Sequence, residues 1–354
     1  MSWVLELARS DIRDLRAYEH ATWEPGLTRL HANELPWRGP VDASAAGLNR
    51  YPEPHPHELA AALARYCAVP EDSVLAGRGS DELIDLLVRA YCRAERDAVL
   101  ICPPTFGMYG VAARIQGAAV HEVALRREAG WELDTEAVRL AALSEAQGVK
   151  LVFVCSPNNP TGNRFDEAAL LSLIRALQGH ALLVVDEAYI EFADAPSLAA
   201  RVAHNPGLVV LRTLSKAHGL AGARCGLAIA HPQIIGLLRK VIPPYAITQP
   251  TIETVLAALR PEALAPTSER IATLRGERVR VAQALQTLPG VQRVWPSETN
   301  FLLVDFADAG AALERAHRAG LLVRDLRGHP LLRRSLRISL GTAEQNDRLL
   351  ACLR

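Results

Sequence analysis

Three polar side chains follow apolar runs of the chain and could together bind and act on a small molecule. They are Asn159 in "CSPNNPTG", Asp186 in "DEAY" and Lys216 in "RTLSK". Taken singly, each has an ordinary interpretation, because Asn-Pro-Thr-Gly suits a turn, an Asp can cap a helix and a Lys is usually solvated. An amide, a carboxylate and a primary amine at corresponding positions, able to converge, favour a binding or catalytic site.

A glycine-rich stretch upstream could bind an anion. In "VLAGRGSDELIDLLVRAYC", Gly77, Gly79 and Ser80 lead from a short apolar run into a segment with helical apolar periodicity. Backbone N–H groups at such a helix start are well matched to a phosphate. The spacing fits neither Gly-x-Gly-x-x-Gly nor the Walker pattern, so no dinucleotide or nucleoside triphosphate is indicated. A plain capped helix remains the alternative.

Apolar runs of strand length alternate with helical patterns through the middle of the chain. This alternation predicts βαβ units around a largely parallel sheet, and the runs are continuously apolar, as in strands covered on both faces. A ligand of such a sheet lies beyond the carboxyl ends of the strands, where the three polar side chains fall. The clearest predicted strands are residues 98–102, 150–156, 181–187 and 207–213, with a helix over 166–179.

The two ends of the chain differ from this middle part. After residue 250, a helical segment over 268–288 and strand candidates over 300–306 and 335–341 predict a smaller α+β domain. The first 40 residues, rich in Pro, Trp and charge, are predicted to form an arm rather than a core element. The predicted division is therefore an N-terminal arm (1–40), a large domain (41–250) and a small C-terminal domain (251–354).

Composition narrows the possible partners. The chain has 354 residues, of which 49% are hydrophobic, and its 39 basic side chains balance 39 acidic ones. A zero formal charge gives no general attraction to nucleic acid or acidic membranes, so small-molecule partners are expected.

The sequence has neither a leader pattern nor an apolar run of membrane-spanning length, which predicts a cytosolic protein. The six cysteines lack Cys-x-x-Cys spacing, so buried free thiols are expected, and no metal site is indicated.

Six stretches, in order across nearly the whole chain, resemble the fold-type I pyridoxal-phosphate aminotransferases, and most closely the histidinol-phosphate aminotransferases among them. The resemblance implies an α/β fold with a large domain on a mostly parallel central sheet and a smaller C-terminal α+β domain. It also implies pyridoxal 5'-phosphate as the cofactor. The stretches are "NRYPEPHP", "GRGSDELIDLLVRAYC", "CPPTFGMY", "CSPNNPTG", "VVDEAYIEF" and "TLSKAHGLAGARCG".

The resemblance implies a role for four residues around the cofactor ring. Lys216 would form a Schiff base with the cofactor aldehyde, which requires a primary amine whose pKa can fall on burial. Asp186 would pair with the pyridine nitrogen and keep it protonated, so that the ring accepts electrons. Asn159 and Tyr189 would hydrogen-bond the ring hydroxyl oxygen. Once displaced by substrate, Lys216 would carry the proton between Cα and the cofactor.

The same resemblance implies a phosphate site and a second subunit. Phe106 would stack on the ring face. Tyr51, in "RYPEP", would reach the cofactor phosphate from a neighbouring subunit, which implies a homodimer with shared active sites. The groups implied to hold the phosphate within one subunit are the backbone of Ser80 and Asp81, the hydroxyls of Thr213 and Ser215, and Arg224.

The implied reaction is transamination between L-histidinol phosphate and 2-oxoglutarate, giving imidazole acetol phosphate and glutamate. Arg337, in "LRISLGT", would bind the glutamate carboxylate and, with Arg324, the phosphate of histidinol phosphate, since a guanidinium suits both anions. Tyr18 and Asn33 match positions that close over the substrate. Without the resemblance, both arginines would be interpreted as solvated surface charges.

The sequence departs from the family pattern at two positions of the site. Phe106 stands where relatives often have Tyr, which preserves stacking and loses a hydroxyl, and His218 replaces a common Phe and has no evident role. Two alternatives of the same fold remain open, namely a threonine-phosphate decarboxylase and a broad aromatic aminotransferase. A non-catalytic cofactor-binding sensor domain is the alternative from another class.

Overall fold

A seven-stranded mixed sheet forms the centre of the protein, in a computed structural model that describes residues 2–20, 24 and 26–354. Its strand order is β1-β7-β6-β5-β4-β2-β3. All neighbouring strands pair in parallel except β7, which is antiparallel to both β1 and β6. The predicted largely parallel sheet is thereby confirmed.

The strands of this sheet fall close to the predicted runs. Each is almost entirely buried, except for β3 at the sheet edge, as expected for strands covered by helices on both faces. The bounds are β1 (Val74–Gly77), β2 (Ala98–Ile101), β3 (Ala119–Glu122), β4 (Val149–Cys155), β5 (Leu182–Asp186), β6 (Leu208–Thr213) and β7 (Gly226–Ala230).

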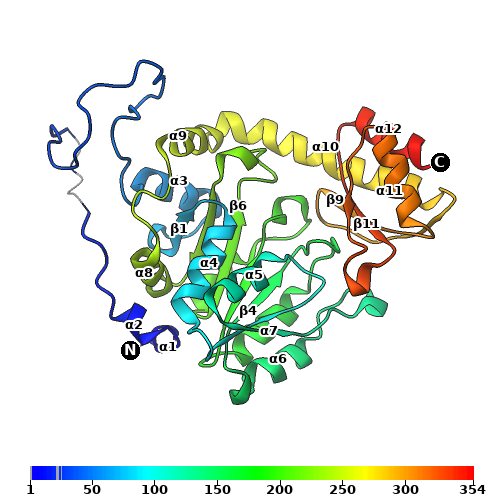
Figure 1. The fold of residues 1–354 in the computed structure, drawn as a ribbon, viewed down its shortest axis with the longest axis horizontal. Helices are drawn as coiled ribbons and strands as arrows, with labels where there is room; N and C mark the ends of the chain where they lie inside the picture. The colour runs from blue at the N-terminus through cyan, green and yellow to red at the C-terminus, as the bar shows by residue number, and fades with distance from the viewer. Residues whose placement is uncertain (1, 21–23, 25) are drawn as a thin grey trace.

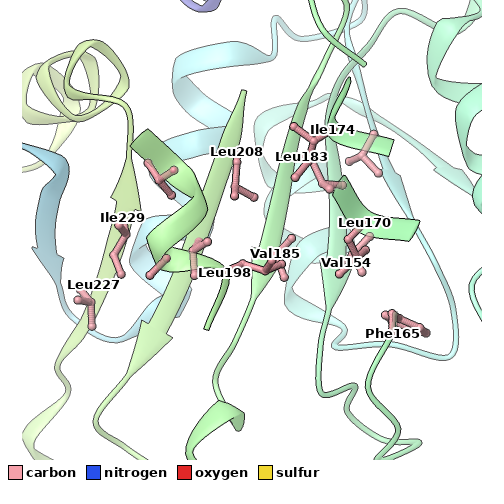
Figure 2. Packing of buried hydrophobic residues seen from close by; sticks show 14 of the residues in the cluster. Val154, Phe165, Leu170, Ile174, Leu183, Val185, Leu198, Leu208, Leu227 and Ile229 are labelled. Atoms are coloured by element: carbon pink, nitrogen blue, oxygen red, sulfur yellow. The ribbon is translucent and has the colours of Figure 1, made fainter. Parts of the chain in front are cut away.

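Alternate side chains of each strand supply two separate apolar cores. Leu183 and Val185 of β5 lie in the cluster shown in Figure 2, with Leu170 and Ile174 of a covering helix. Leu182 and Val184 belong to a second cluster on the opposite face. The helices of the first face include α3 (His57–Cys67), α6 (Thr135–Leu143), α7 (Glu167–Ala176) and α9 (Gln249–Ala258); those of the second include α4 (Ser80–Tyr91), α5 (Met108–Gln116) and α8 (Pro232–Val241).

A second, smaller sheet lies at the C-terminal end of the chain, on the side of the molecule away from the N-terminal segment (Figure 1). Its order is β10-β11-β9-β8, and every neighbouring pair is antiparallel. The long helix α10 (Pro261–Gln286) runs from the large sheet toward it. The remaining elements are β8 (Val291–Val294), β9 (Phe301–Phe306), β10 (Arg324–Asp325), β11 (Ser335–Ser339), α11 (Ala309–Arg318) and α12 (Ala343–Leu353).

The two sheets match the predicted division into a large and a small part, although the domain boundaries themselves stay predictions. Ile252 and Val255 of α9 are buried in the first cluster of the large sheet. The small sheet has its own cluster, which includes Val304, Leu336 and Leu350. The small cluster begins after α9, with Val281 of α10, although Leu303 of β9 still packs in the first cluster.

The first residues of the chain pack into the core, so the expectation that residues 1–40 contribute no core element is wrong for this segment. Val4, Leu7 and Ala8, in and after α1 (Trp3–Glu6), are buried in the second cluster. A second short helix, α2 (Ser10–Arg13), follows. Beyond it the described chain extends away from the body of the protein, as an arm would (Figure 1).

The cysteines are free and mostly buried, as the sequence predicted. All six cysteines are free, and five of them are buried. In the described part of the chain, none of the helices combines the length and the apolarity needed to cross a bilayer.

Candidate active site

A cavity of about 570 Å³ opens at the carboxyl edge of the large sheet. The last residues of β4, β5 and β6, namely Cys155, Asp186 and Thr213, all line it. The sheet thus places its polar strand ends together, as the alternation predicted. The predicted site residues in its wall are Ser80, Asp81, Phe106, Asn159, Asp186, Tyr189, Thr213, Ser215, Lys216, Arg224, Arg324 and Arg337.

One corner of the cavity gathers groups that suit a phosphate. Helix α4 begins after Gly79, which has φ +81°. Because glycine has no side chain that could cap the helix, the N–H groups of the first turn receive no hydrogen bond from this position. Arg224 approaches so closely that a Cβ on Gly79 would lie 2.6 Å from its Nη2 atom. The hydroxyls of Thr213 and Ser215 lie 3.0 Å apart in the same wall. A helix N-terminus, two hydroxyls and a guanidinium therefore converge, and these donors fit a phosphate dianion.

Asp186 is held as a buried acceptor at the floor of the cavity. Its Oδ2 accepts a hydrogen bond of 2.8 Å from the Tyr109 hydroxyl, and its Oδ1 accepts one of 3.1 Å from the Ala188 N–H. Burial raises the pKa of Asp186 to about 6, and both donors oppose that rise. A carboxylate in this setting gains from a cationic partner, such as a protonated ring nitrogen.

Tyr109 is a site residue that the sequence did not assign. It is fully buried at the start of α5 and stacks on Phe153 at 4.8 Å between ring centroids. Its ring also lies 5.6 Å from that of Phe106, which precedes the helix. The resembling stretch "CPPTFGMY" ends on Tyr109. No sequence pattern linked Tyr109 to the site, because Phe106 precedes the helix and the contact with Asp186 spans 77 positions.

Lys216 presents its amine to the cavity in an environment that favours the uncharged form. Burial lowers its pKa, and the nearby Arg337 and Arg224 guanidinium groups lower it further, against the opposite effect of Asp81 and Asp186. Its Nζ lies 5.8 Å from the ring centroid of Tyr189. A less basic amine is a better nucleophile at neutral pH, which is the property a covalent bond to a carbonyl requires.

Two arginines of the small sheet complete the cavity wall. Arg324 of β10 and Arg337 of β11 are directly paired across the strands. The Arg337 Nη1 donates to Asn159 Oδ1, so the small sheet contacts the loop that follows β4 of the large sheet. Burial lowers the pKa of Arg337, and its Nε has no hydrogen-bond partner in the described structure. Arg337 is therefore a half-buried guanidinium in the cavity wall, and not the solvated surface charge of the alternative interpretation.

Three predicted residues lie outside the cavity of this chain. Tyr51 stacks on Tyr245, with ring centroids 4.6 Å apart, and is 51% exposed. Tyr18 is 70% exposed, with its ring 5.5 Å from that of His20. Asn33 lies in the arm with a left-handed φ of 58°. None of the three is in the described wall of the cavity.

Comparisons with known proteins agree with this geometry. A model of the family "Aminotransferase class I and II" matches residues 32–353. Histidinol-phosphate aminotransferase from Stenotrophomonas maltophilia is 49% identical over 353 residues, covering 99% of this chain and 96% of that protein. The same enzyme from Xanthomonas oryzae pv. oryzae is 48% identical over 355 residues, covering 99% and 97%.

Solved structures of the same kind share the fold. Histidinol-phosphate aminotransferase from Clostridium acetobutylicum superposes with a TM-score of 0.78 at 20% identity, covering 86% of this chain and 90% of that one. The enzyme from Sinorhizobium meliloti, solved in complex with pyridoxal-5'-phosphate, gives a TM-score of 0.77 at 27% identity, covering 87% and 83%.

Proposed function

The chain belongs to the class I and II aminotransferases, and we propose that it transfers the amino group of L-histidinol phosphate to 2-oxoglutarate. The cofactor of this reaction would be pyridoxal 5'-phosphate. The observation that carries the proposal is a single cavity with Lys216 and Asp186 on one side and the paired Arg324 and Arg337 on the other. The relatives named histidinol-phosphate aminotransferase support it, because they are nearly half identical over almost the full chain.

The residues of the cavity fit the proposed cofactor at both of its ends. The corner around Gly79 and Arg224 would hold the phosphate, and Asp186 would pair with the ring nitrogen across the cavity floor. Asn159 and Tyr189 would hydrogen-bond the ring oxygen. When bound, the cofactor supplies a ring that accepts the electrons left by breaking the substrate Cα–H bond.

The protein's own groups would then position the reactants and move the proton. Lys216 would attach the cofactor and, as a free amine, accept the Cα proton, since its lowered pKa leaves it less protonated than an ordinary lysine at neutral pH. Phe106 would cover one ring face. Asp186 would remain ionised against the ring nitrogen, which offsets its burial.

Two anionic substrates would use the arginine pair in turn. A guanidinium binds a carboxylate or a phosphate through two parallel N–H donors, so Arg337 and Arg324 could accept glutamate or histidinol phosphate. Loss of the Arg337 and Arg324 guanidinium groups should weaken the binding of both substrates more than it weakens cofactor binding.

A homodimer with shared sites is the proposed assembly. The arm exposes apolar side chains, among them Leu30 at 90% and Trp37 at 76%, and this exposure supports coverage by a second copy. Tyr51 lies outside the cavity of its own chain, as expected if it serves the partner's cofactor phosphate. Sedimentation should show a dimer, and a mixture of Tyr51→Phe and Lys216→Ala subunits should regain intact sites in mixed dimers. A cytoplasmic location stays a prediction.

The deciding experiment is an assay of purified protein with histidinol phosphate and 2-oxoglutarate. Glutamate should form, the native protein should be yellow, and borohydride should trap the cofactor on Lys216. Release of CO2 from threonine phosphate without glutamate formation would favour the decarboxylase, and turnover of aromatic amino acids alone would favour the broad aminotransferase. Turnover that is lost in Lys216→Ala would exclude a non-catalytic sensor.

A further inference from the structure

A buried polar cluster lies on the other face of β6, behind the cavity. It consists of Tyr66 on α3, Glu191, Arg212 and His218, and is called the Tyr66 cluster below. Arg212 Nη2 donates to Glu191 Oε1 at 2.6 Å, and both side chains are only 9% exposed. The Arg212 guanidinium also lies over the Tyr66 ring, 5.1 Å from its centroid.

His218 joins this cluster through Tyr66. Its Nε2 lies 2.9 Å from the Tyr66 hydroxyl oxygen, and the two rings meet edge to face at 5.2 Å. The hydroxyl also lies 3.5 Å from Arg212 Nη2. Because a guanidinium can only donate, the hydroxyl accepts from Arg212 and has its own proton available for His218 Nε2.

Three of the four cluster members are close in sequence to a proposed cofactor residue. Arg212 directly precedes Thr213, Glu191 follows Tyr189 by two residues, and His218 follows Lys216 by two. The residues just before Lys216 are tied to β6 and to the chain beyond the loop, because Ser215 N donates to Thr213 Oγ1 at 3.2 Å and Leu214 N donates to Cys225 O at 3.1 Å. For residues 216–219, the described structure has a long hydrogen bond within the loop, from Gly219 N to Lys216 O (3.4 Å), and the contact of the His218 side chain with Tyr66. The side chain of His218 is therefore a principal anchor of this loop.

We propose that His218, hydrogen-bonded to Tyr66, is a positioning residue that fixes the Lys216 loop to helix α3 and so aims the amine at the cofactor. Through Arg212 and Glu191 the same cluster holds the segment that carries Tyr189. The inference rests on the proposed function, since it concerns the residue proposed to attach the cofactor. It assigns a role to the one position of the loop that the family resemblance left unexplained.

The test uses Tyr66→Phe, His218→Phe and the double variant of the full chain. Each keeps an aromatic ring and removes the hydrogen bond. We expect each single variant to bind pyridoxal phosphate about two- to tenfold more weakly, the usual effect of one lost hydrogen bond. The double variant should bind no more weakly than the worse single one, because both changes break the same contact.

Two further readouts separate positioning from general stability. The pH midpoint of the bound cofactor's absorption should shift in both variants, because the nitrogen of a looser Lys216 would lie differently among the charges of Arg337, Arg224 and Asp186. The urea midpoint of unfolding should change little in His218→Phe, since that change also removes a buried Nδ1 that has no partner in the described structure. Tyr91→Phe is the matched control, because Tyr91 is fully buried and its hydroxyl has no partner in the described structure.

The proposal is overturned if both variants keep wild-type cofactor affinity and pH midpoint. It is equally overturned if the losses multiply in the double variant, or if affinity falls only in step with global stability. Hydrogen exchange of residues 214–220 in the apoprotein should be faster in both variants. That measurement needs no cofactor, so it still decides the proposal if the wild-type protein fails to bind pyridoxal phosphate and the proposed function is wrong.

Discussion

Replacing Tyr109 by Phe should weaken cofactor binding without unfolding the protein. The substitution removes one oxygen atom, which donates a 2.8 Å hydrogen bond to Asp186 Oδ2 in a fully buried setting. The ring and its stacking on Phe153 are retained. What is lost is therefore a single donor to the carboxylate proposed to pair with the cofactor ring nitrogen.

The size of the effect follows from the charge of the acceptor. A hydrogen bond to an ionised group contributes about 1.5–3 kcal/mol, which corresponds to roughly 10- to 150-fold in affinity for a cofactor that requires the ionised carboxylate. The pKa of Asp186, already raised to about 6 by burial, should rise further because the Tyr109 bond opposes that rise. The deficit should thus be largest at pH 6 and below and shrink toward pH 8, as Asp186 becomes ionised in a growing fraction of both proteins.

The assay is titration of apoprotein with pyridoxal phosphate, followed by absorbance, at several pH values. Tyr91→Phe removes the same atom from a buried tyrosine whose hydroxyl has no partner in the described structure, so it should bind the cofactor as the wild type does. Equal affinities of Tyr109→Phe and wild type from pH 6 to pH 8 would refute the role assigned to this hydroxyl. A deficit that grows with pH would refute the linkage to Asp186.

Three further predictions concern stability and the phosphate corner. Burial raises the pKa of Glu187 from 4.5 to about 7. Because this pKa is higher in the folded protein than in the unfolded chain, the free energy of unfolding should fall by about 3 kcal/mol as the pH rises through this range. Urea unfolding of apoprotein Glu187→Gln should show a smaller fall, and an unchanged one would contradict the assignment. Gly79→Ala should lose most cofactor affinity, because its Cβ would lie 2.6 Å from Arg224 Nη2, whereas Gly236→Ala, with no atom within 4 Å, should bind normally. Asp305→Ala should lower the free energy of unfolding by about 2–3 kcal/mol, since this carboxylate accepts from an arginine, an indole and a serine hydroxyl; full stability in urea would contradict that value.

Sequence patterns predicted the sheet and most of the cavity for a definite physical reason. Strands buried on both faces are continuously apolar, so their ends, and the polar residues beyond them, can be found by inspection. Asp186 and Thr213 stand at such ends. The N-terminal packing was missed because Val4 and Leu7 form too short an apolar pattern to indicate a buried turn.

Contacts between distant parts of the chain were not predictable in the same way. Tyr109 reaches Asp186 across 77 positions, and His218 reaches Tyr66 across 152. Neither pair has a periodicity that links its members, because helix packing on the two faces of the sheet brings them together. The fold therefore had to be known before either residue could be given a role.

The alternation of β6 explains why a polar cluster stands behind the site. Thr213 faces the cavity, so Arg212 must face the opposite side, where Leu208 and Val210 lie in the first core. A buried ion pair there is a poor source of stability, since desolvation offsets much of its attraction, and Glu191 Oε2 and Arg212 Nε have no partners in the described structure. Apolar side chains would serve the core at least as well. What they could not do is tie the loops bearing Tyr189 and Lys216 to one helix through directional hydrogen bonds, and this is the physical argument for a cluster that acts on the site rather than on the fold.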